Sequence, residues 1–383
     1  MNNSKIWLSS PHLGGTEYAF VQDAFSSNWI APLGPNVDGF ELDLEKYLGE
    51  SVSVGALSAG TAAIHLGLIL LGVSKNDEVL VQTHTHNASV NPIIYLGATP
   101  IFIDSELDTF NLCPEILEQA IVDRIKKGKK PKAIIAVHLY GMPYKIEAIR
   151  SVADKYEIPI LEDSAEALGS NFKGQKCGTF GDIGILSFNG NKIITTSGGG
   201  AIVTKTKALK EKALFFATQA RDVAPHFQHS EIGYNYRLSN ICAGIGRGQM
   251  QVVDAHIEKR RAIHDFYVIL FKNIEGVNVS EVPNADYYSN YWLTTIQIDP
   301  KITRGITRET LRLALDSENI ESRPFWKPMH MQPVFEKFPY YGTQIAASLF
   351  ENGLCLPSGS NLTEEEKNRI SFVVKKIFSK QSV

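Results

Sequence analysis

The chain has little of several features that mark particular protein classes. Its 383 residues include only four cysteines, none of them in a Cys-x-x-Cys pair: Cys113, Cys177, Cys242 and Cys355. This pattern indicates neither a disulfide framework nor a zinc knuckle. The formal net charge of -3 gives no electrostatic reason to expect nucleic acid as a partner. No uninterrupted run of about 18 apolar residues occurs and no basic-then-apolar segment opens the chain. We therefore expect a soluble, unprocessed protein of the reducing cytoplasm with no membrane partner.

Apolar, strand-like runs alternate with helical patterns over the first two thirds of the chain. Such alternation predicts an α/β fold, with a mostly parallel central sheet flanked by helices on both faces. The predicted strands are residues 52–57, 78–82, 99–103, 133–138, 158–161 and 183–188, and predicted helices include 62–71 and 145–156. Ligands of such sheets bind beyond the carboxyl ends of the strands. Ser58 to Thr61 and Glu162-Asp163 each follow a predicted strand, so we expect both at one crevice.

The pattern changes near residue 250. A long helix is predicted over 250–271, followed by a strand-like piece at 291–298 and a helix at 307–317. The last predicted helix, 363–379, opens with Thr363 and Glu366 as a capping box. We therefore predict two domains: a large one over 1–254 that includes an N-terminal substrate segment, and a smaller α+β domain over 255–383.

Two residues indicate the chemistry. Asp163 ends an apolar strand, and Lys192 follows another strand and precedes the small residues Thr-Thr-Ser-Gly-Gly-Gly. A pyridoxal-phosphate enzyme needs a carboxylate to hold the pyridine nitrogen protonated and an amine to form a Schiff base. Each residue also has a simpler interpretation, because most lysines are surface charges and Asp163 could cap a helix beginning at Ser164.

A phosphate group also needs donors. The Gly60-Thr61 turn presents backbone N–H groups at a predicted helix N-terminus, which attracts an oxyanion. Ser187 could add a hydroxyl to the same phosphate. Glu166 could contact the cofactor ring or its phenolic oxygen, although an ordinary helix carboxylate explains it nearly as well.

Taken together, several segments resemble the DegT/DnrJ/EryC1/StrS family of sugar aminotransferases, which are fold type I pyridoxal-phosphate enzymes. The resemblance spans nearly the whole chain and rests on LSAGTAAIHLGL, GATPIFID, AVHLYG, LEDSAEALGS, GDIGILSFNGNKIITTSGGG, GYNYRLSN and RPFWKPMHMQP. It implies pyridoxal 5'-phosphate as the cofactor, with pyridoxamine 5'-phosphate as its aminated form.

The resemblance also implies roles for individual residues. Lys192 would form the Schiff base and carry the proton, Asp163 would face the pyridinium nitrogen, and Glu166 would contact the ring hydroxyl. Gly60, Thr61 and Ser187 match phosphate ligands of the family. Asn235, in GYNYRLSN, matches a phosphate ligand supplied by the neighbouring subunit, so the resemblance implies a homodimer with shared active sites.

One segment, QTHTHNASV, departs from the family pattern. The family usually has an aromatic residue after the threonine to stack on the cofactor ring, and here that residue is His86. An imidazole can also stack, so we keep His86 as a cofactor contact. His84 and His86 would lie on one strand face, but a metal site needs further ligands that the sequence does not provide, and we predict no metal.

Within the family, RPFWKPMH and IAPLGPNVDGFE most resemble the transaminases that make UDP-4-amino-4,6-dideoxy-N-acetylglucosamine. This implies L-glutamate as amine donor and a UDP-linked 4-keto-6-deoxy-N-acetyl sugar as acceptor. Candidate contacts to the nucleotide sugar are Arg323, Trp326, Lys327 and His330, because cations suit diphosphate oxygens and tryptophan can lie along a ring. Arg237 could contact substrate or only hold the loop that bears Asn235.

Other functions stay open on the sequence. Another nucleotide sugar could be the acceptor, such as GDP-4-keto-6-deoxymannose giving perosamine, or a dTDP-linked keto sugar. The family's 3-dehydratases carry histidine where this chain has Lys192, which argues against that reaction. A non-catalytic regulator on the same fold is a further alternative. A nicotinamide-binding enzyme is disfavoured because no Gly-x-Gly-x-x-Gly follows the first strand.

Overall fold

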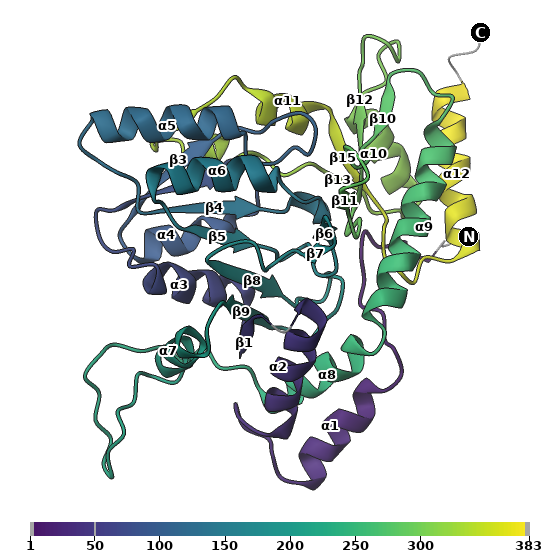
Figure 1. Ribbon diagram of the computed structural model, residues 1–383. Coiled ribbons are helices and arrows are strands. Elements are labelled where there is room, and N and C mark those ends of the chain that lie inside the picture. Colours follow the sequence, from purple (N-terminus) through teal and green to yellow (C-terminus); the bar gives the residue numbers. More distant parts are fainter. Residues whose placement is uncertain (1–3, 50, 380–383) are drawn as a thin grey trace.

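The computed structural model describes residues 4–49 and 51–379. Within them, eight strands form a sheet of order β1-β9-β8-β5-β4-β2-β3-β14 (Figure 1). Their bounds are β1 (Ser53–Leu57), β2 (Glu78–Gln82), β3 (Thr99–Ile103), β4 (Ala133–Val137), β5 (Ile160–Asp163), β8 (Ile183–Ser187), β9 (Gly200–Thr204) and β14 (Tyr340–Tyr341).

This sheet is mostly parallel, as predicted. In the central pairs Leu80 of β2 lies opposite Ile101 of β3 and Ile134 of β4, both in parallel register. β9 runs antiparallel to its two neighbours, β1 and β8, so those two strands share the direction of the rest. The carboxyl ends of β1, β2, β5 and β8 therefore meet at one edge of the sheet.

Helices cover both faces of the sheet (Figure 1). α3 (Gly60–Leu70), α4 (Asn91–Tyr95) and α7 (Lys207–Ala217) lie on one face, and α5 (Pro114–Lys126) and α6 (Ile146–Tyr156) on the other. Side chains of a strand alternate between faces. Accordingly Val79 and Val81 of β2 belong to the core beneath α3, while Leu80 between them packs with Leu117 and Ile149 of α5 and α6.

A further helical group packs near β1. α1 (Glu17–Ser26) and α2 (Pro35–Leu48) lie against α8 (Asn240–Met250). In their core Phe40 of α2 meets Phe188, the residue after β8, edge to face with ring centroids 5.2 Å apart. The N-terminal helices are thereby fixed to the strand that leads to Lys192.

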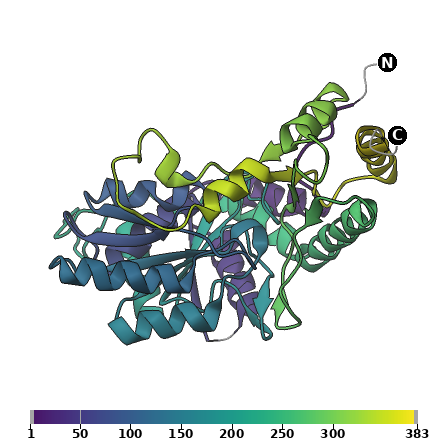
Figure 2. The same cartoon turned by 90° about the horizontal axis from the view of Figure 1, so that it is seen from above.

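A smaller sheet lies at one end of the large one, with α9 (Val253–Phe271), α10 (Arg308–Ser317) and α12 (Glu364–Phe378) packed around it (Figures 1 and 2). Its order is β10 (Val277–Val279), β12 (Thr294–Ile298), β15 (Gly353–Leu356) and β13 (Arg323–Pro324). The other elements are β6 (Asn171–Phe172), β7 (Gln175–Lys176), β11 (Tyr287–Tyr288), α11 (Ile345–Asn352), and the 3-10 turns η1 (Asn87–Ser89), η2 (Leu139–Gly141) and η3 (Met329–Met331). No helix among the described residues is both long enough and apolar enough to cross a membrane.

Several expected elements differ in detail. The helix predicted over 250–271 is confirmed as α9, but it begins at Val253, because the backbone of Val252 leaves the helical region and Met250 ends α8. The strand predicted over 291–298 begins at Thr294, since Tyr291 has a φ of 44° that a strand does not allow. The capping box of the last helix is confirmed, with Thr363 accepting from the Glu366 amide at 3.2 Å.

The division at 254/255 stays a prediction. That boundary falls inside the first turn of α9. Two segments also join parts of the chain on either side of it: Ile6 pairs with Ile320, and β14 adds to the edge of the large sheet next to β3.

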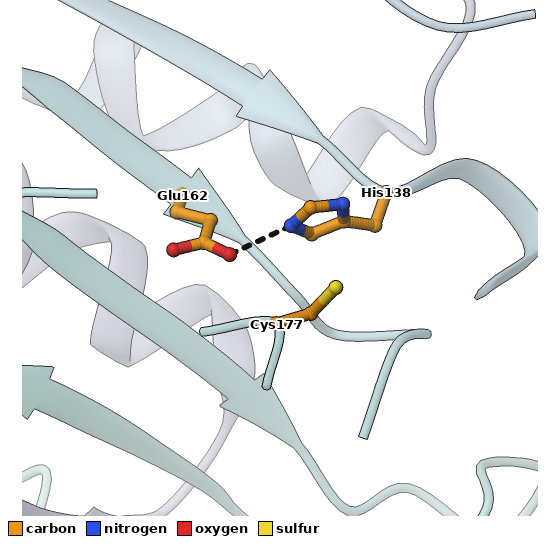
Figure 3. Close-up of side chains that lie close together, drawn as sticks. All are labelled: His138, Glu162 and Cys177. Carbon is orange, nitrogen blue, oxygen red and sulfur yellow. Dashed lines mark hydrogen bonds and ion pairs between the residues drawn. The ribbon is translucent and has the colours of Figure 1, made fainter. Parts of the chain in front are cut away.

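Glu162 anchors a loop to the large sheet (Figure 3). Its side chain on β5 is fully buried and lies beside His138 and Cys177. It accepts hydrogen bonds from His138 Nε2 at 2.7 Å and, at 2.6 to 2.7 Å, from the amides of three loop residues, Gly178, Phe180 and Gly181. Burial alone would raise the pKa of Glu162, but the bonds from His138 and the amides hold it below its ordinary value.

We expect Glu162→Gln to lower the free energy of unfolding by about 2–4 kcal/mol at neutral pH, since the amide presents a donor to a site built of donors. The lowered pKa means that the carboxylate stabilises the fold above the unfolded value of 4.5 and that this contribution is lost as the pH falls further. Urea denaturation at pH 7.5 and pH 4 measures both effects. Glu147→Gln, at an exposed pair with Lys173, is the control and should change stability much less; equal losses in both variants would contradict the assignment.

Candidate active site

A cavity of about 350 Å³ lies at the edge where the strands of the large sheet end. It is formed by the β1–α3 turn, the segment after β2, and the residues after β5 and β8, with two tryptophans from the later part of the chain. The predicted shared crevice is thus present. Eight of the residues expected at the site line it: Gly60, Thr61, His86, Asp163, Glu166, Ser187, Lys192 and Trp326.

Lys192 enters the cavity from the loop after β8. Its side chain is 14% exposed, with Nζ 3.3 Å from Glu166 Oε1 and 4.1 Å from the centre of the Trp292 ring. The Trp292 indole is itself held by a hydrogen bond of 2.6 Å from Nε1 to the Asn191 carbonyl. The amine therefore lies between the face of an indole ring and one carboxyl group.

Asp163 faces the same cavity from the end of β5. Its side chain is 3% exposed. Oδ1 accepts from the Ala165 amide at 3.1 Å, and Oδ2 accepts from the Ser89 hydroxyl at 2.7 Å. The residues after Asp163 form turns and no helix, so the helix-capping alternative is wrong.

Glu166 is fully enclosed between Lys192 and η2. Its Oε2 accepts from the Tyr140 amide at 2.7 Å. Burial raises the pKa of Glu166 to about 7, although Lys192 and the Tyr140 amide act in the opposite direction. Tyr140 has a φ of 55°, which is unusual for a residue with a side chain, and its hydroxyl accepts from the Trp326 amide at 3.0 Å. Bonds at both ends of Tyr140 thus hold this backbone conformation.

The N-terminus of α3 opens on the cavity as an anion site. Among the described residues no side chain caps this helix at Ala59, so its first amides are available to an oxyanion. The backbone is also unusually close here: a Cβ on Gly60 would lie 2.9 Å from Ser187 Cβ, and one on Gly200 would lie 2.4 Å from the Gly60 nitrogen. An amine, a buried carboxylate and an uncapped helix end around one cavity fit the aldehyde, ring nitrogen and phosphate of pyridoxal phosphate.

His86 and Trp326 stand between this cavity and a second one of about 300 Å³. Their rings are 5.2 Å apart and close to perpendicular. Burial, with Lys192 nearby, lowers the pKa of His86 and favours the neutral imidazole. β2 ends at Gln82, so His84 and His86 do not share a strand face; His84 is fully buried beside Phe325. Lys327 lines the second cavity.

Four expected site residues line neither of these two cavities. Arg237 forms an ion pair with Glu41 and donates to the Ala56 carbonyl at 2.8 Å, which holds its loop to β1. Arg323 is mostly exposed and pairs with Glu321. His330 stacks on Tyr340 at 3.9 Å and contacts Thr83 Oγ1 at 2.7 Å. Asn235 pairs with Thr218 beyond α7.

Comparison with known proteins agrees with this geometry. Residues 11–375 match the model of the DegT/DnrJ/EryC1/StrS aminotransferase family. The chain belongs to this family. EpsN of Bacillus subtilis (strain 168), provisionally named a pyridoxal phosphate-dependent aminotransferase, is 48% identical over 98% of this chain and 96% of its own. A protein of Escherichia coli O157:H7 named GDP-perosamine synthase is 40% identical over 94% of this chain and 95% of its own.

A solved structure supports the same conclusion. The crystal structure of a DegT DnrJ EryC1 StrS aminotransferase from Brucella abortus superimposes with a TM-score of 0.88 at 28% identity, covering 95% of both chains. The fold is therefore that of the fold type I enzymes, and the chain is a pyridoxal-phosphate-dependent aminotransferase.

Three side chains that could ligate a metal lie close together beside the end of β5. The ligand atoms of His138, Glu162 and Cys177 lie within 4.8 Å of one another (Figure 3). The His138 ring is already used on both sides, since Nε2 meets Glu162 and Nδ1 accepts from the Tyr144 amide at 3.3 Å. These contacts explain the cluster as the anchor of the loop at 177–181.

Sequence reasoning missed part of the aminotransferase site. Trp292 belongs to no motif that we identified, and Tyr140 lies in AVHLYG, which served only for the resemblance. Ser89 lies in QTHTHNASV, the segment noted for His86. No local sequence pattern marks a serine or a tryptophan as a site residue, because its position beside Asp163 or Lys192 depends on how the chain folds.

We expect the stability of the cofactor-free protein to depend on Glu166 and pH. Because the pKa of this carboxyl is raised to about 7 in the folded protein, its contribution to stability is greatest below the unfolded value of 4.5 and declines as the pH rises to about 7. Glu166→Gln should remove this decline. The melting temperature of the variant minus that of the wild type should therefore increase between pH 5 and pH 8. Parallel melting profiles of the two proteins would show that the carboxyl titrates normally.

Proposed function

We propose that this aminotransferase moves the amine of L-glutamate to C4 of a nucleotide-linked 4-keto-6-deoxy sugar, releasing 2-oxoglutarate. The observation that carries the proposal is the arrangement of Lys192, Asp163 and the α3 N-terminus around one cavity, with a second cavity beyond His86 and Trp326. The second cavity offers room for the nucleotide sugar beside the reacting centre.

Each residue has a proposed role in this reaction. When bound, pyridoxal phosphate supplies an aldehyde that takes up the amine and a ring that withdraws electrons from the adjacent carbon. Lys192 Nζ holds the cofactor covalently at rest and then takes and returns the substrate proton. Asp163 keeps the ring nitrogen protonated, and Glu166 faces the ring hydroxyl. Gly60, Thr61 and Ser187 hold the phosphate, and His86 stacks on the ring.

The acceptor we propose first is the UDP-linked 4-keto-6-deoxy-N-acetyl sugar, which would give UDP-4-amino-4,6-dideoxy-N-acetylglucosamine. The segments RPFWKPMH and IAPLGPNVDGFE support this acceptor, because they most resemble those of the transaminases that make this product. Of these segments, Trp326 and Lys327 line the second cavity, whereas Arg323 and His330 make contacts within the protein. A GDP-linked keto sugar is the second candidate, because a relative named GDP-perosamine synthase is 40% identical.

A substrate panel separates these acceptors. The protein is first converted with L-glutamate to the form that carries pyridoxamine 5'-phosphate. It is then mixed separately with UDP-, GDP- and dTDP-linked 4-keto-6-deoxy sugars, and the return of the pyridoxal 5'-phosphate absorbance is followed. We expect the UDP-linked N-acetyl sugar to react fastest. Lys192→Ala should reduce turnover by about 10³-fold or more, while Lys173→Ala, at the exposed pair with Glu147, should not change it. Fastest reaction of the GDP sugar would replace the first candidate by the second.

We further propose a homodimer with shared sites. Asn235 lies at the base of the segment between α7 and α8, which extends away from the body of the molecule (Figure 1). Three apolar side chains on this segment are largely exposed, Val223, Phe227 and Ile232. A second copy would cover them and bring Asn235 to the neighbouring phosphate site.

Mixed dimers test the shared site. When Asn235→Ala on one chain is combined with Lys192→Ala on the other, a shared arrangement leaves one site with both residues intact. We therefore expect about half of the wild-type turnover per dimer, well above that of dimers carrying Asn235→Ala on both chains. Activity no higher than half that of the Asn235→Ala homodimer would mean that each site is built from a single chain.

A further inference from the structure

Two buried hydroxyl groups connect to Asp163 inside the cavity. Ser89, in η1, is 2% exposed, and its Oγ lies 2.7 Å from Asp163 Oδ2. Thr85, four residues earlier, is fully buried, and its Oγ1 lies 2.8 Å from Ser89 Oγ. Both residues line the cofactor cavity.

The direction of these two hydrogen bonds follows from the chemistry. An ionised carboxylate can only accept, so the single proton of the Ser89 hydroxyl must point toward Asp163. Ser89 can then meet Thr85 only through a lone pair, so Thr85 is the donor in that contact. Hydrogen bonds in such a chain polarise one another, so the bond that Ser89 makes to Asp163 is stronger than one from an isolated hydroxyl.

Asp163 is also held at its other oxygen. The Ala165 amide donates to Oδ1 at 3.1 Å, while Ser89 donates to Oδ2. One donor on each oxygen prevents the carboxylate from rotating about its terminal bond. These two hydrogen bonds also offset part of the free-energy cost of burying the charge of Asp163, which is 3% exposed.

The same short turn positions His86. The imidazole Nδ1 accepts from the Ala88 amide at 3.2 Å, which places His86 at the N-terminus of η1. Residues 85–89 thus carry His86, which is proposed to stack on the cofactor ring, and the two hydroxyl groups connected to Asp163, which is proposed to contact the ring nitrogen. A shift of this turn would move both together.

We infer that Ser89, supported by Thr85, is a positioning residue that holds the Asp163 carboxylate in the orientation in which it would meet the ring nitrogen of the cofactor. The inference rests on the proposed role of Asp163. Ser89 itself touches neither the cofactor's reacting atoms nor the sugar, and acts only through the carboxylate.

The test compares four variants with the wild type. Ser89→Ala removes the donor, and Ser89→Thr keeps a hydroxyl there. Thr85→Val removes the second hydroxyl at similar volume. Ser164→Ala is the matched control: Ser164 is equally buried and follows Asp163 directly, but its hydroxyl contacts Glu162 at 3.3 Å. Thermal unfolding of the cofactor-free proteins verifies that all four fold.

Three measurements are made on the homodimer as purified: the dissociation constant of pyridoxamine 5'-phosphate, the pH dependence of the bound cofactor's absorbance, and kcat and KM for glutamate. Ser89→Ala should bind pyridoxamine 5'-phosphate about 10-fold more weakly and lose about 10–100-fold in kcat, with little change in KM. It should also shift the absorbance titration. Ser89→Thr should stay near the wild type, Thr85→Val should fall between, and Ser164→Ala should match the wild type.

Asp163→Asn, measured in parallel, separates this inference from the proposed function. If Asp163→Asn loses affinity and kcat while Ser89→Ala does not, the inference is wrong and the role of Asp163 stands. Equal effects of Ser89→Ala and Ser164→Ala, with no shift in the absorbance titration, would reduce Ser89 to a packing role and overturn it. If Asp163→Asn resembles the wild type, both fail.

Discussion

A single buried guanidinium joins the parts of the chain on which the active site depends. Arg260 of α9 is 1% exposed, and in the described chain it has no carboxylate partner. Its NH groups instead reach the Trp292 and Ser358 carbonyls at 2.7 and 2.9 Å, the Ser9 hydroxyl at 3.0 Å and the Lys192 carbonyl at 3.4 Å. A buried charge is costly unless it is well hydrogen-bonded. The acceptors must therefore be in place together, so the N-terminal segment, the lysine loop and the smaller sheet are coupled.

The large sheet supplies the second constraint. Because β1, β2, β5 and β8 run in one direction, their carboxyl ends lie at one edge of the sheet. The Gly60-Thr61 turn, the turn that bears His86, Asp163 and Lys192 therefore meet there. Glu162, next to Asp163 on β5, points to the loop at 177–181 and ties it down through three amides. Glu162 thus holds a loop while its neighbour Asp163 lines the cavity, since successive side chains of a strand point to opposite faces.

The two cavities are built from different parts of the aminotransferase. The first is lined mainly by residues that follow strands of the large sheet, whereas Trp326 and Lys327 follow β13 of the smaller sheet and reach the second. Tyr140 links the two regions, because its amide donates to Glu166 and its hydroxyl accepts from the Trp326 amide. The segment after β13 thus meets the loops of the large sheet where the two cavities adjoin, because Trp326 lines both of them.

From the sequence alone we obtained the α/β class, six of the eight strands of the large sheet to within two residues, and the family. These depend on local periodicity and on motifs that are continuous in the chain. The sequence also placed Asp163 and Gly60 at one crevice, since both lie where parallel strands end. It did not distinguish Trp326, which lines the cavity, from Arg323 and His330 in the same motif, which pair with Glu321 and Tyr340. Only the tertiary structure decided that Trp292 covers Lys192, that Ser89 meets Asp163 from 74 residues away, and that Arg260 joins four segments. These contacts bring together residues far apart in sequence, and nothing in the local pattern of a single serine, tryptophan or arginine specifies its neighbour in space.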